Sequence, residues 1–232
     1  MVRVTPEPVI DAVLFDFRGT LFTDEADATW IRNAAASIGR DLSDDEITSI
    51  LERGAAVMEE QPEIRTALDR SDISAEAHRA ANLAWHRAIG LDEDLAHAIW
   101  ARDGHPDASF PYEDGLEVMR TLKEHSKKIA VVSNIHYDLR DHFGRHGLDE
   151  YVDAYVQSYE LGCQKPDREM FTRALDALGV TADRALMVGD RPELDGGAVE
   201  FGILTLLLPG PVVYGTAGRR GLDAVLRLLG IS

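Results

Sequence analysis

The 232-residue sequence predicts an α/β protein: a doubly wound, Rossmann-like parallel sheet with an inserted helical segment. From residue 111 onward, short apolar runs alternate with segments of helical periodicity, which is the pattern of parallel strands joined by crossover helices. Residues 22–110 show helical periodicity only. We therefore expect a core formed by residues 1–21 and 111–232 and a helical cap formed by residues 22–110.

The core strands are predicted by nearly continuous apolar runs, which indicate strands buried on both faces. The expected strands are Val9–Phe17, Lys128–Ser133, Ala154–Ser158, Ala185–Gly189 and Ile203–Leu208. The expected core helices are Glu113–His125, Asp138–Arg145, Asp167–Leu178 and Leu222–Leu229. Because strands and helices alternate, the helices are expected to cover both faces of the sheet.

The helices of the inserted segment are predicted by their capping residues. Ser43 and Glu46 have the spacing of a capping box, in which each side chain accepts from the other's backbone N–H. Ser74 begins a second helix, which ends near Gly90, and Asp92–Arg102 forms a third. The segment should therefore fold as a small helical unit.

Charge and cysteine content limit the partners of the chain. Its formal net charge is −17, which disfavours nucleic acid and anionic membranes as partners. A phosphorylated substrate would need a local cation. Cys163 is the single cysteine, so an intrachain disulfide is excluded and a reducing compartment is favoured. No signal peptide or membrane-spanning stretch is found. We predict a cytoplasmic protein with a small-molecule substrate, and its oligomeric state stays open.

Polar side chains follow the predicted strands at the ends where ligands of doubly wound sheets bind. They are Asp16 after the first strand, Ser133 and Asn134 after the second, Lys165 in a later loop, and Asp190 with Asp195 after the fourth. Grouped carboxylates suit a hard cation such as Mg²⁺. A lysine and a hydroxyl suit phosphate oxygens, and an aspartate at a strand end can be a covalent nucleophile.

The segments FDFRGTLF, VVSNIHYDLR, QKPDREMF and MVGDRPELDGGA resemble, in order and spacing, the four motifs of the haloacid dehalogenase superfamily. The resemblance covers roughly residues 9–209, and residues 22–110 resemble the helical cap of that family. It implies a hydrolase that forms an aspartyl-phosphate with Mg²⁺ as cofactor. The implied nucleophile is Asp16, oriented by Thr20.

The resemblance also implies the ligand-binding residues. Mg²⁺ would be held by Asp16, the backbone carbonyl of Arg18 and Asp190. Asp195 would support the metal from behind these ligands. The implied phosphoryl-binding residues are Ser133, Asn134 and Lys165.

The first motif departs from the phosphatase pattern at Arg18, where the family's phosphatases have an aspartate that acts as acid and base. Arginine stays protonated and cannot take that role, and losing a general acid or base costs about 10²- to 10⁴-fold in rate. Arg18 could contact substrate, pair with Asp16 or Asp190, or point outward. Without the acid, leaving groups of low pKa, such as aryl and acyl phosphates, should be favoured, and a carboxylate at position 18 should raise the hydrolysis of alkyl phosphates.

Two other functions are consistent with parts of the sequence. Arg18 also fits a binding or regulatory protein with little turnover. A dehalogenase acting at carbon would have tyrosine at this position and would lack the Gly189-Asp190 pair, which this chain has. The phosphonoacetaldehyde hydrolases need a lysine in the cap, and residues 22–110 contain none. We therefore predict a phosphoryl hydrolase or transferase.

Several aromatic residues allow two interpretations. Trp30, Trp85 and Trp100 could form the core of the helical segment, or one of them could line an apolar substrate pocket. His136 and Tyr137 follow the second motif directly and could either pack or line the pocket.

Overall fold

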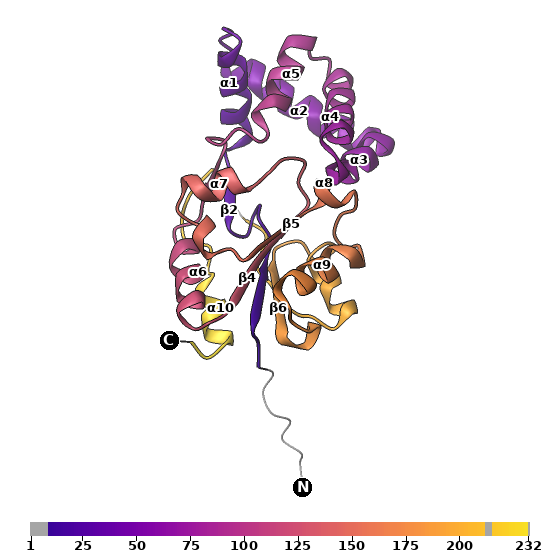
Figure 1. Ribbon diagram of the computed structural model, residues 1–232. Coiled ribbons are helices and arrows are strands. Elements are labelled where there is room, and N and C mark those ends of the chain that lie inside the picture. The colour runs from indigo at the N-terminus through magenta and orange to yellow at the C-terminus, as the bar shows by residue number, and fades with distance from the viewer. Residues whose placement is uncertain (1–8, 212–214, 232) are drawn as a thin grey trace.

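The structure is a computed structural model that describes residues 9–211 and 215–231. Its centre is a five-stranded parallel sheet in the order β5–β4–β1–β6–β7 (Figure 1), which confirms the predicted doubly wound sheet. The strands are β1 (Ala12–Phe15), β4 (Lys128–Ser133), β5 (Ala154–Gln157), β6 (Ala185–Gly189) and β7 (Leu204–Leu207).

Strand β1 occupies the middle of the sheet. Its last residue, Phe15, is paired with Val131 of β4 on one side and with Val188 of β6 on the other. All residues of β1 are fully buried, as its continuous apolar sequence predicts. The carboxyl ends of β4, β1 and β6 therefore lie side by side, and the residues that follow them meet at one edge.

Helices cover both faces of this sheet (Figure 1). One face is covered by α6 (Gly115–Glu124), α7 (Arg140–Arg145) and α10 (Asp223–Leu228), and the other by α9 (Arg168–Leu178) and the 3-10 helix η4 (Gly196–Phe201). Shorter elements between them are η2 (Asp149–Tyr151), α8 (Ser158–Leu161) and η3 (Ala182–Arg184). Each face has its own apolar core, centred on Phe143 on the first and on Phe171 on the second.

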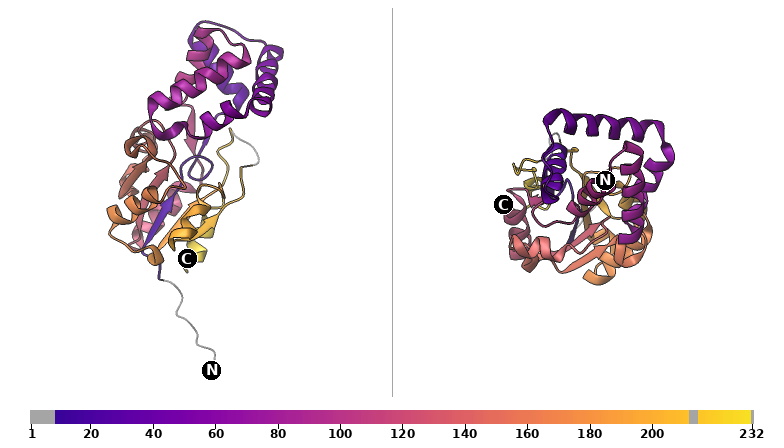
Figure 2. Two further views of the ribbon diagram at one scale, coloured as in Figure 1. Left: turned by 90° about the vertical axis from the view of Figure 1, so that its right-hand side faces the viewer. Right: turned by 90° about the horizontal axis from the view of Figure 1, so that it is seen from above.

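Five helices form a separate layer beyond the carboxyl end of the sheet (Figure 2). They are α1 (Asp27–Ser37), α2 (Asp44–Glu60), α3 (Pro62–Asp69), α4 (Ala75–Ile89) and α5 (Glu93–Arg102), with η1 (Ser71–Ile73) before α4. The capping box of Ser43 and Glu46 and the N-cap of Ser74 are present as predicted. The helices pack around a core of their own that includes Ile31, Ile50 and others.

A two-stranded antiparallel ribbon connects this layer to the sheet. It consists of β2 (Phe22–Asp24) and β3 (Ser109–Pro111). The sequence analysis did not predict it, because strands of three residues are too short to show an alternating pattern. The chain passes through β2 into α1 and returns from α5 through β3, so both connections run through the ribbon.

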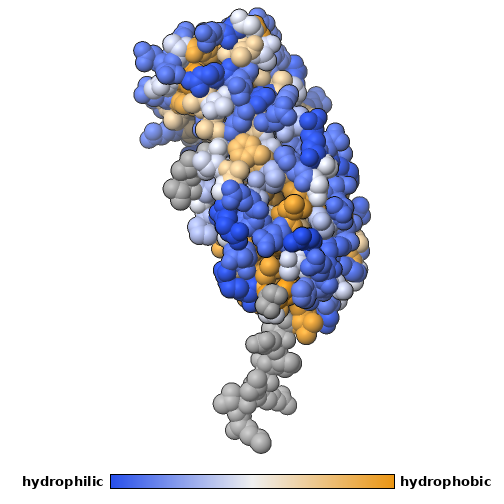
Figure 3. Space-filling model, turned by 90° about the vertical axis from the view of Figure 1, so that its left-hand side faces the viewer, coloured by the Kyte–Doolittle hydropathy of each residue, from blue (hydrophilic) through white to orange (hydrophobic). Residues whose placement is uncertain are grey.

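The surface is consistent with the acidic composition. The face shown in Figure 3 is predominantly hydrophilic, and its hydrophobic side chains lie in small, separate groups. Among the described residues, no helix is both long enough and apolar enough to cross a membrane.

Candidate active site

Four charged side chains from separate segments meet at the carboxyl end of the sheet. The Nζ atom of Lys165 lies 2.6 Å from Oδ1 of Asp16 and 2.7 Å from Oδ1 of Asp195. Asp16, Asp190 and Asp195 each offer a carboxylate oxygen within 4.8 Å of the others. The structure thus brings together the acidic residues and the lysine that the motifs single out.

The two carboxylates after β6 differ in how their oxygens are used. Oδ2 of Asp195 accepts hydrogen bonds from the backbone N–H groups of Asp190 and Arg191, at 3.1 and 3.0 Å, while Oδ1 accepts from Lys165. In contrast, Oδ1 of Asp190 is buried and has no hydrogen-bond partner among the described residues. Asp195 is therefore committed to holding the loop and Lys165, whereas Asp190 has an oxygen available for a ligand.

Two glycines allow these carboxylates to approach the backbone. Gly19 has a φ of 79°, and a Cβ atom there would lie 2.4 Å from Oδ2 of Asp190. At Gly189 a Cβ atom would lie 2.2 Å from a side-chain oxygen of Asp195. Any other residue at either position would displace a carboxylate, so the glycines of both motifs are required by packing.

The electrostatics of the cluster favour an additional cation. Burial raises the pKa of Asp16 above its ordinary value, against the lowering effect of Lys165. Burial also raises the pKa of Asp190, and Asp195 adds to this effect. One ammonium group faces three carboxylates, and Oδ1 of Asp190 has no hydrogen-bond partner in the described part of the chain. Because Mg²⁺ prefers oxygen ligands, the residues present fit a hard divalent cation.

The other predicted site residues lie around this cluster. Thr20 donates a hydrogen bond of 3.3 Å to Oδ2 of Asp16, which suits an orienting role. Ser133 is buried at the end of β4, and its hydroxyl lies 3.5 Å from the carbonyl oxygen of Asn134, at the long limit of a hydrogen bond.

The side chain of Asn134 is occupied by protein partners. Its Nδ2 donates to the carbonyl oxygen of Lys165 at 3.2 Å, and its Oδ1 accepts from the backbone N–H of Lys165 at 2.7 Å. The side-chain amide thus binds the backbone of Lys165, and the phosphate contact that the resemblance implies for Asn134 stays a prediction. This arrangement fixes the loop that presents the lysine.

Arg18 is paired with carboxylates other than those considered in the sequence analysis. Its Nε lies 2.8 Å from Oδ2 of Asp24 in β2, and its Nη2 binds Asp103, which follows α5. The same Nη2 donates to the hydroxyl of Tyr137 at 3.0 Å. The guanidinium therefore joins the first motif to the helical layer. An ion pair with Asp16 or Asp190, one of the predicted alternatives, is not what the structure has.

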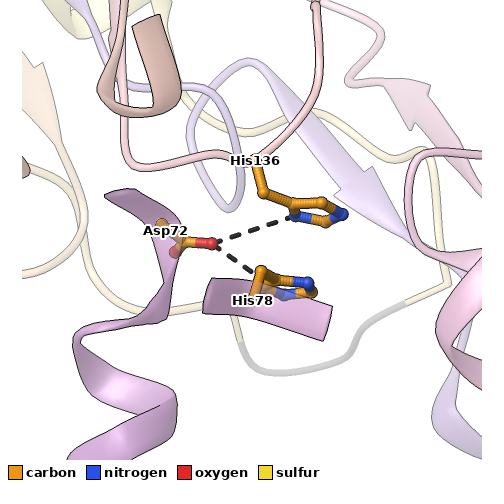
Figure 4. Close-up of side chains that lie close together, drawn as sticks. All are labelled: Asp72, His78 and His136. Carbon is orange, nitrogen blue, oxygen red and sulfur yellow. Dashed lines mark ion pairs between the residues drawn. The ribbon is translucent and has the colours of Figure 1, made fainter. Parts of the chain in front are cut away.

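A second polar cluster consists of Asp72, His78 and His136 (Figure 4), and both histidines lie within 4 Å of Asp103. The rings of His78, from α4, and His136, from the loop after β4, are stacked with centroids 3.5 Å apart and planes 7° apart. Oδ1 of Asp72 lies 3.9 Å from a nitrogen of each ring. By residue type this cluster resembles a metal site.

The hydrogen bond of Trp100 opposes metal binding at His78. An indole N–H can only donate, and Nε1 of Trp100 lies 3.1 Å from Nδ1 of His78. Nδ1 is therefore an acceptor, and its lone pair is not available to a metal. Nε2 lies 3.1 Å from Nδ2 of Asn82 and 3.3 Å from Oδ2 of Asp103. We interpret the cluster as support for Asp103, which holds Arg18.

Sequence reasoning did not identify Asp24, Asp72, His78 or Asp103. No motif spacing connects them with the first motif, and Asp103 is 85 residues from Arg18. His136 was singled out as a residue of packing or of the pocket, and it lies in the cluster described above. The excess of acidic over basic residues in the helical segment is the sequence signal that could have suggested partners for Arg18.

A cavity of about 1020 Å³ extends from Asp190 into the helical layer. Arg18 and Asp190 line it on the core side. On the other side all three tryptophans line it, together with Ile31, Ile50, Leu51, Met58, Ile89 and Ile99. The tryptophans were expected either to form the core of the helical segment or to contribute one side chain to a pocket. In the structure all three side chains line the cavity.

The stability of the helical layer should depend on pH through His86. Burial lowers the pKa of His86 to about 4, although a backbone hydrogen bond with Ala96 opposes this. Between pH 6.5 and 4 the unfolded chain binds a proton that the folded chain does not, so unfolding becomes easier as the pH falls. From pH 7 to pH 5 this costs about 2 kcal/mol.

The prediction can be checked by urea unfolding at pH 7 and pH 5. The wild type should lose unfolding free energy between pH 7 and pH 5. In the His86→Gln variant this loss should be smaller by about 2 kcal/mol. Equal pH dependence in the variant and the wild type would contradict a buried, neutral His86.

Comparison with known proteins gives the family. The pattern of the haloacid dehalogenase-like hydrolases matches residues 10–200. The chain is 28% identical over 211 residues to a ribulose-1,5-bisphosphate 5-phosphatase of Halopiger xanaduensis, covering 84% of this chain and 83% of that protein. It is 29% identical over 210 residues to a glyceraldehyde 3-phosphate phosphatase of Methanopyrus kandleri, covering 85% and 83%.

Among solved structures, a haloacid dehalogenase-type phosphatase from Thermococcus onnurineus superposes with a TM-score of 0.62 at 22% identity, covering 95% of this chain and 98% of that one. At this identity the match shows the fold. The chain belongs to the haloacid dehalogenase-like hydrolases, as the four motifs indicated. It is an enzyme of the hydrolase class, and the curated relatives named above are phosphatases.

Proposed function

We propose that this protein is a Mg²⁺-dependent phosphatase that transfers the phosphoryl group of a small phosphate ester to Asp16 and then to water. The proposal rests mainly on the cluster of Asp16, Lys165, Asp190 and Asp195, with its unpartnered Oδ1 on Asp190. It is supported by relatives whose names describe phosphatases for phosphorylated metabolites.

In this proposal the carboxylate of Asp16 attacks phosphorus and the ester oxygen leaves with the electrons of the broken bond. Thr20 orients Asp16, and Lys165 offsets negative charge on the phosphoryl oxygens. The hydroxyl of Ser133, which has only a long contact, is free to donate to the same oxygens. Asn134 and Asp195 are positioning residues for Lys165.

Mg²⁺ would be held by Asp16, Asp190 and the backbone carbonyl of Arg18, with Asp195 behind them. When bound, it would supply positive charge beside the transferred group. The added charge would also favour the ionised form of Asp16, whose pKa is raised by burial. Residues 22–110 would act as the cap over the site, and residues 1–21 with 111–232 as the catalytic core.

Arg18 restricts which esters can react. Its guanidinium is committed to Asp24 and Asp103 and cannot donate a proton to a leaving group. Leaving groups that depart as stable anions are therefore favoured, as in aryl and acyl phosphates. A binding or regulatory protein with little turnover is the alternative that Arg18 supports.

The assay of p-nitrophenyl phosphate tests this function. We expect hydrolysis with Mg²⁺, loss of activity with EDTA, and recovery when excess Mg²⁺ is added. Asp190→Asn should weaken Mg²⁺ binding measured by calorimetry, because it removes the carboxylate with the free oxygen. Glu193→Gln, an exposed change in the same loop, should not.

Three results would contradict the proposal. Hydrolysis that is unaffected by EDTA would exclude the metal. Release of halide from 2-haloacids without metal would indicate a dehalogenase. No turnover of any phosphate ester by folded protein that binds Mg²⁺ would favour the binding or regulatory alternative.

A further inference from the structure

We infer that the cavity beneath the helical layer is a compartment for a large aromatic group of the ester that carries no charge of its own before the reaction, so that the substrates are aryl phosphate monoesters. This inference rests on the proposed phosphatase function and adds the substrate class. The cavity borders the cluster of reacting groups, since Asp190 and Arg18 form part of its wall, although Asp16 and Lys165 do not. A phosphoryl group at Asp16 would leave the remainder of the ester facing the helical layer.

The size of the cavity suits more than a short sugar phosphate. Its volume of about 1020 Å³ lies at the upper end of the range of roughly 300–1,000 Å³ typical of small-molecule sites. Trp30, Trp85 and Trp100 are only partly buried although they belong to the helical layer, and all three line this space. Their exposed ring surface is therefore presented to the cavity.

The indole groups cannot hydrogen-bond a polar substrate. Each indole N–H already donates to an acceptor within the protein. The acceptors are the carbonyl of Ile99 for Trp30 at 3.1 Å, the carbonyl of Gly54 for Trp85 at 3.4 Å, and Nδ1 of His78 for Trp100 at 3.1 Å. What the three rings present is apolar carbon, on which another aromatic ring can stack.

The charges in the wall disfavour a second phosphate or a carboxylate on the substrate. Six acidic and two basic residues are found among the described residues that line the cavity. Of the basic ones, Arg18 is neutralised by Asp24 and Asp103. The other, Arg191, lies in the core loop after β6, 3.9 Å from Glu193. A bisphosphate would therefore meet no lysine or arginine in the helical part of the wall, among the described residues that line the cavity.

The carboxylates are also poor partners for sugar hydroxyls. Asp24 and Asp103 are bound by Arg18, and Glu25 accepts from Arg102 at 3.1 Å. A sugar hydroxyl that is buried beside these three occupied carboxylates without a partner costs about 1–3 kcal/mol. A neutral aromatic group gives up little hydration by comparison.

The chemistry of the site favours the same class. Arg18 supplies no proton, so the leaving group must be stable as an anion, as a phenolate or naphtholate is. The alkoxide of a sugar is not. The need for a leaving group of low pKa and the apolar lining of the cavity are independent arguments, and both favour an aryl ester. The experiment must therefore separate the effect of leaving-group pKa from the effect of the aromatic ring.

The test compares 1-naphthyl phosphate with acetyl phosphate, which has a good leaving group but no ring, and with ribose 5-phosphate. We expect KM for 1-naphthyl phosphate to be at least about tenfold below that for acetyl phosphate. Turnover of ribose 5-phosphate should be slower than that of both. Calorimetry with 1-naphthol, the product, on Asp16→Asn protein measures occupancy of the cavity without any reaction.

Two neighbouring positions on α2 provide a matched pair of variants. Met58 lines the cavity, while Glu59 is exposed and does not. Met58→Gln should raise KM for 1-naphthyl phosphate and Kd for 1-naphthol about tenfold, with acetyl phosphate unchanged. Glu59→Gln introduces glutamine at the next position of α2 and should change neither this KM nor this Kd.

Each outcome has a distinct meaning. Hydrolysis of ribose 5-phosphate as efficient as that of 1-naphthyl phosphate would overturn the substrate class and leave the phosphatase function intact. Failure of 1-naphthol to bind would overturn the compartment itself. Binding of 1-naphthol that is weakened by Met58→Gln, in a protein without phosphatase activity, would support the compartment and overturn the proposed function.

Discussion

Asp16→Asn is expected to abolish hydrolysis of p-nitrophenyl phosphate while the fold remains intact. The amide cannot attack phosphorus as an anion, and removal of a covalent nucleophile costs about 10³-fold or more. The local contacts can persist, because the amide oxygen can still accept from Lys165. Burial already disfavours the ionised form of Asp16, so the free energy of unfolding should be unchanged or slightly higher.

The control for this experiment lies at the other end of the same strand. Asp11 precedes β1, is partly exposed and pairs with Arg184. Asp11→Asn therefore removes the same charge from the same segment at a distance from the site, and should retain full turnover. An acid-quenched reaction should contain phosphorylated wild-type protein and none of the Asp16→Asn variant. Wild-type turnover by that variant would show that another group attacks phosphorus.

The fold was predictable because its strands are buried on both faces. In β1 every residue is fully buried, and a run of apolar residues followed by Asp16 and Gly19 leaves little choice of structure. The position of the carboxylates then follows from the parallel arrangement, since strand ends meet at one edge. The ribbon of β2 and β3 was not predictable in this way, because pairing between distant three-residue segments has no local signal.

The surroundings of the site were less predictable because they depend on contacts between distant segments. Asn134 lies at the expected strand end, but its amide binds the backbone of Lys165, and only the path of that loop reveals this. Likewise Arg18 is at the expected position, but its partners come from the ribbon and from the end of α5. Motif spacing predicts the backbone position of a site residue, whereas packing between the layers determines which residues its side chain contacts.

The ion pairs of Arg18 change what a carboxylate at that position should do. Arg18→Asp would place a third carboxylate beside Asp24 and Asp103, whose side chains are only 15% and 13% exposed. Losing the cation of a buried pair costs about 3–5 kcal/mol, and we expect about 2 kcal/mol because a third of the Arg18 side chain is exposed. The gain in alkyl phosphate hydrolysis expected from the sequence should therefore be absent in the single variant. Urea unfolding and the rate with an alkyl phosphate measure the two effects.

A charge-matched variant should recover that gain. In Arg18→Asp combined with Asp24→Asn and Asp103→Asn, a single carboxylate remains, so the local net charge equals that of the wild type. Its carboxyl group could protonate an alkoxide and activate water, a role worth at most about 10²- to 10⁴-fold. The comparison protein carries the two Asn substitutions and keeps Arg18, so the pair differs at one position. We expect the ratio of alkyl to aryl phosphate turnover to rise in the triple variant alone. If Arg18→Asp by itself is as stable as the wild type and shows the same gain, then Asp24 and Asp103 do not determine the environment of position 18.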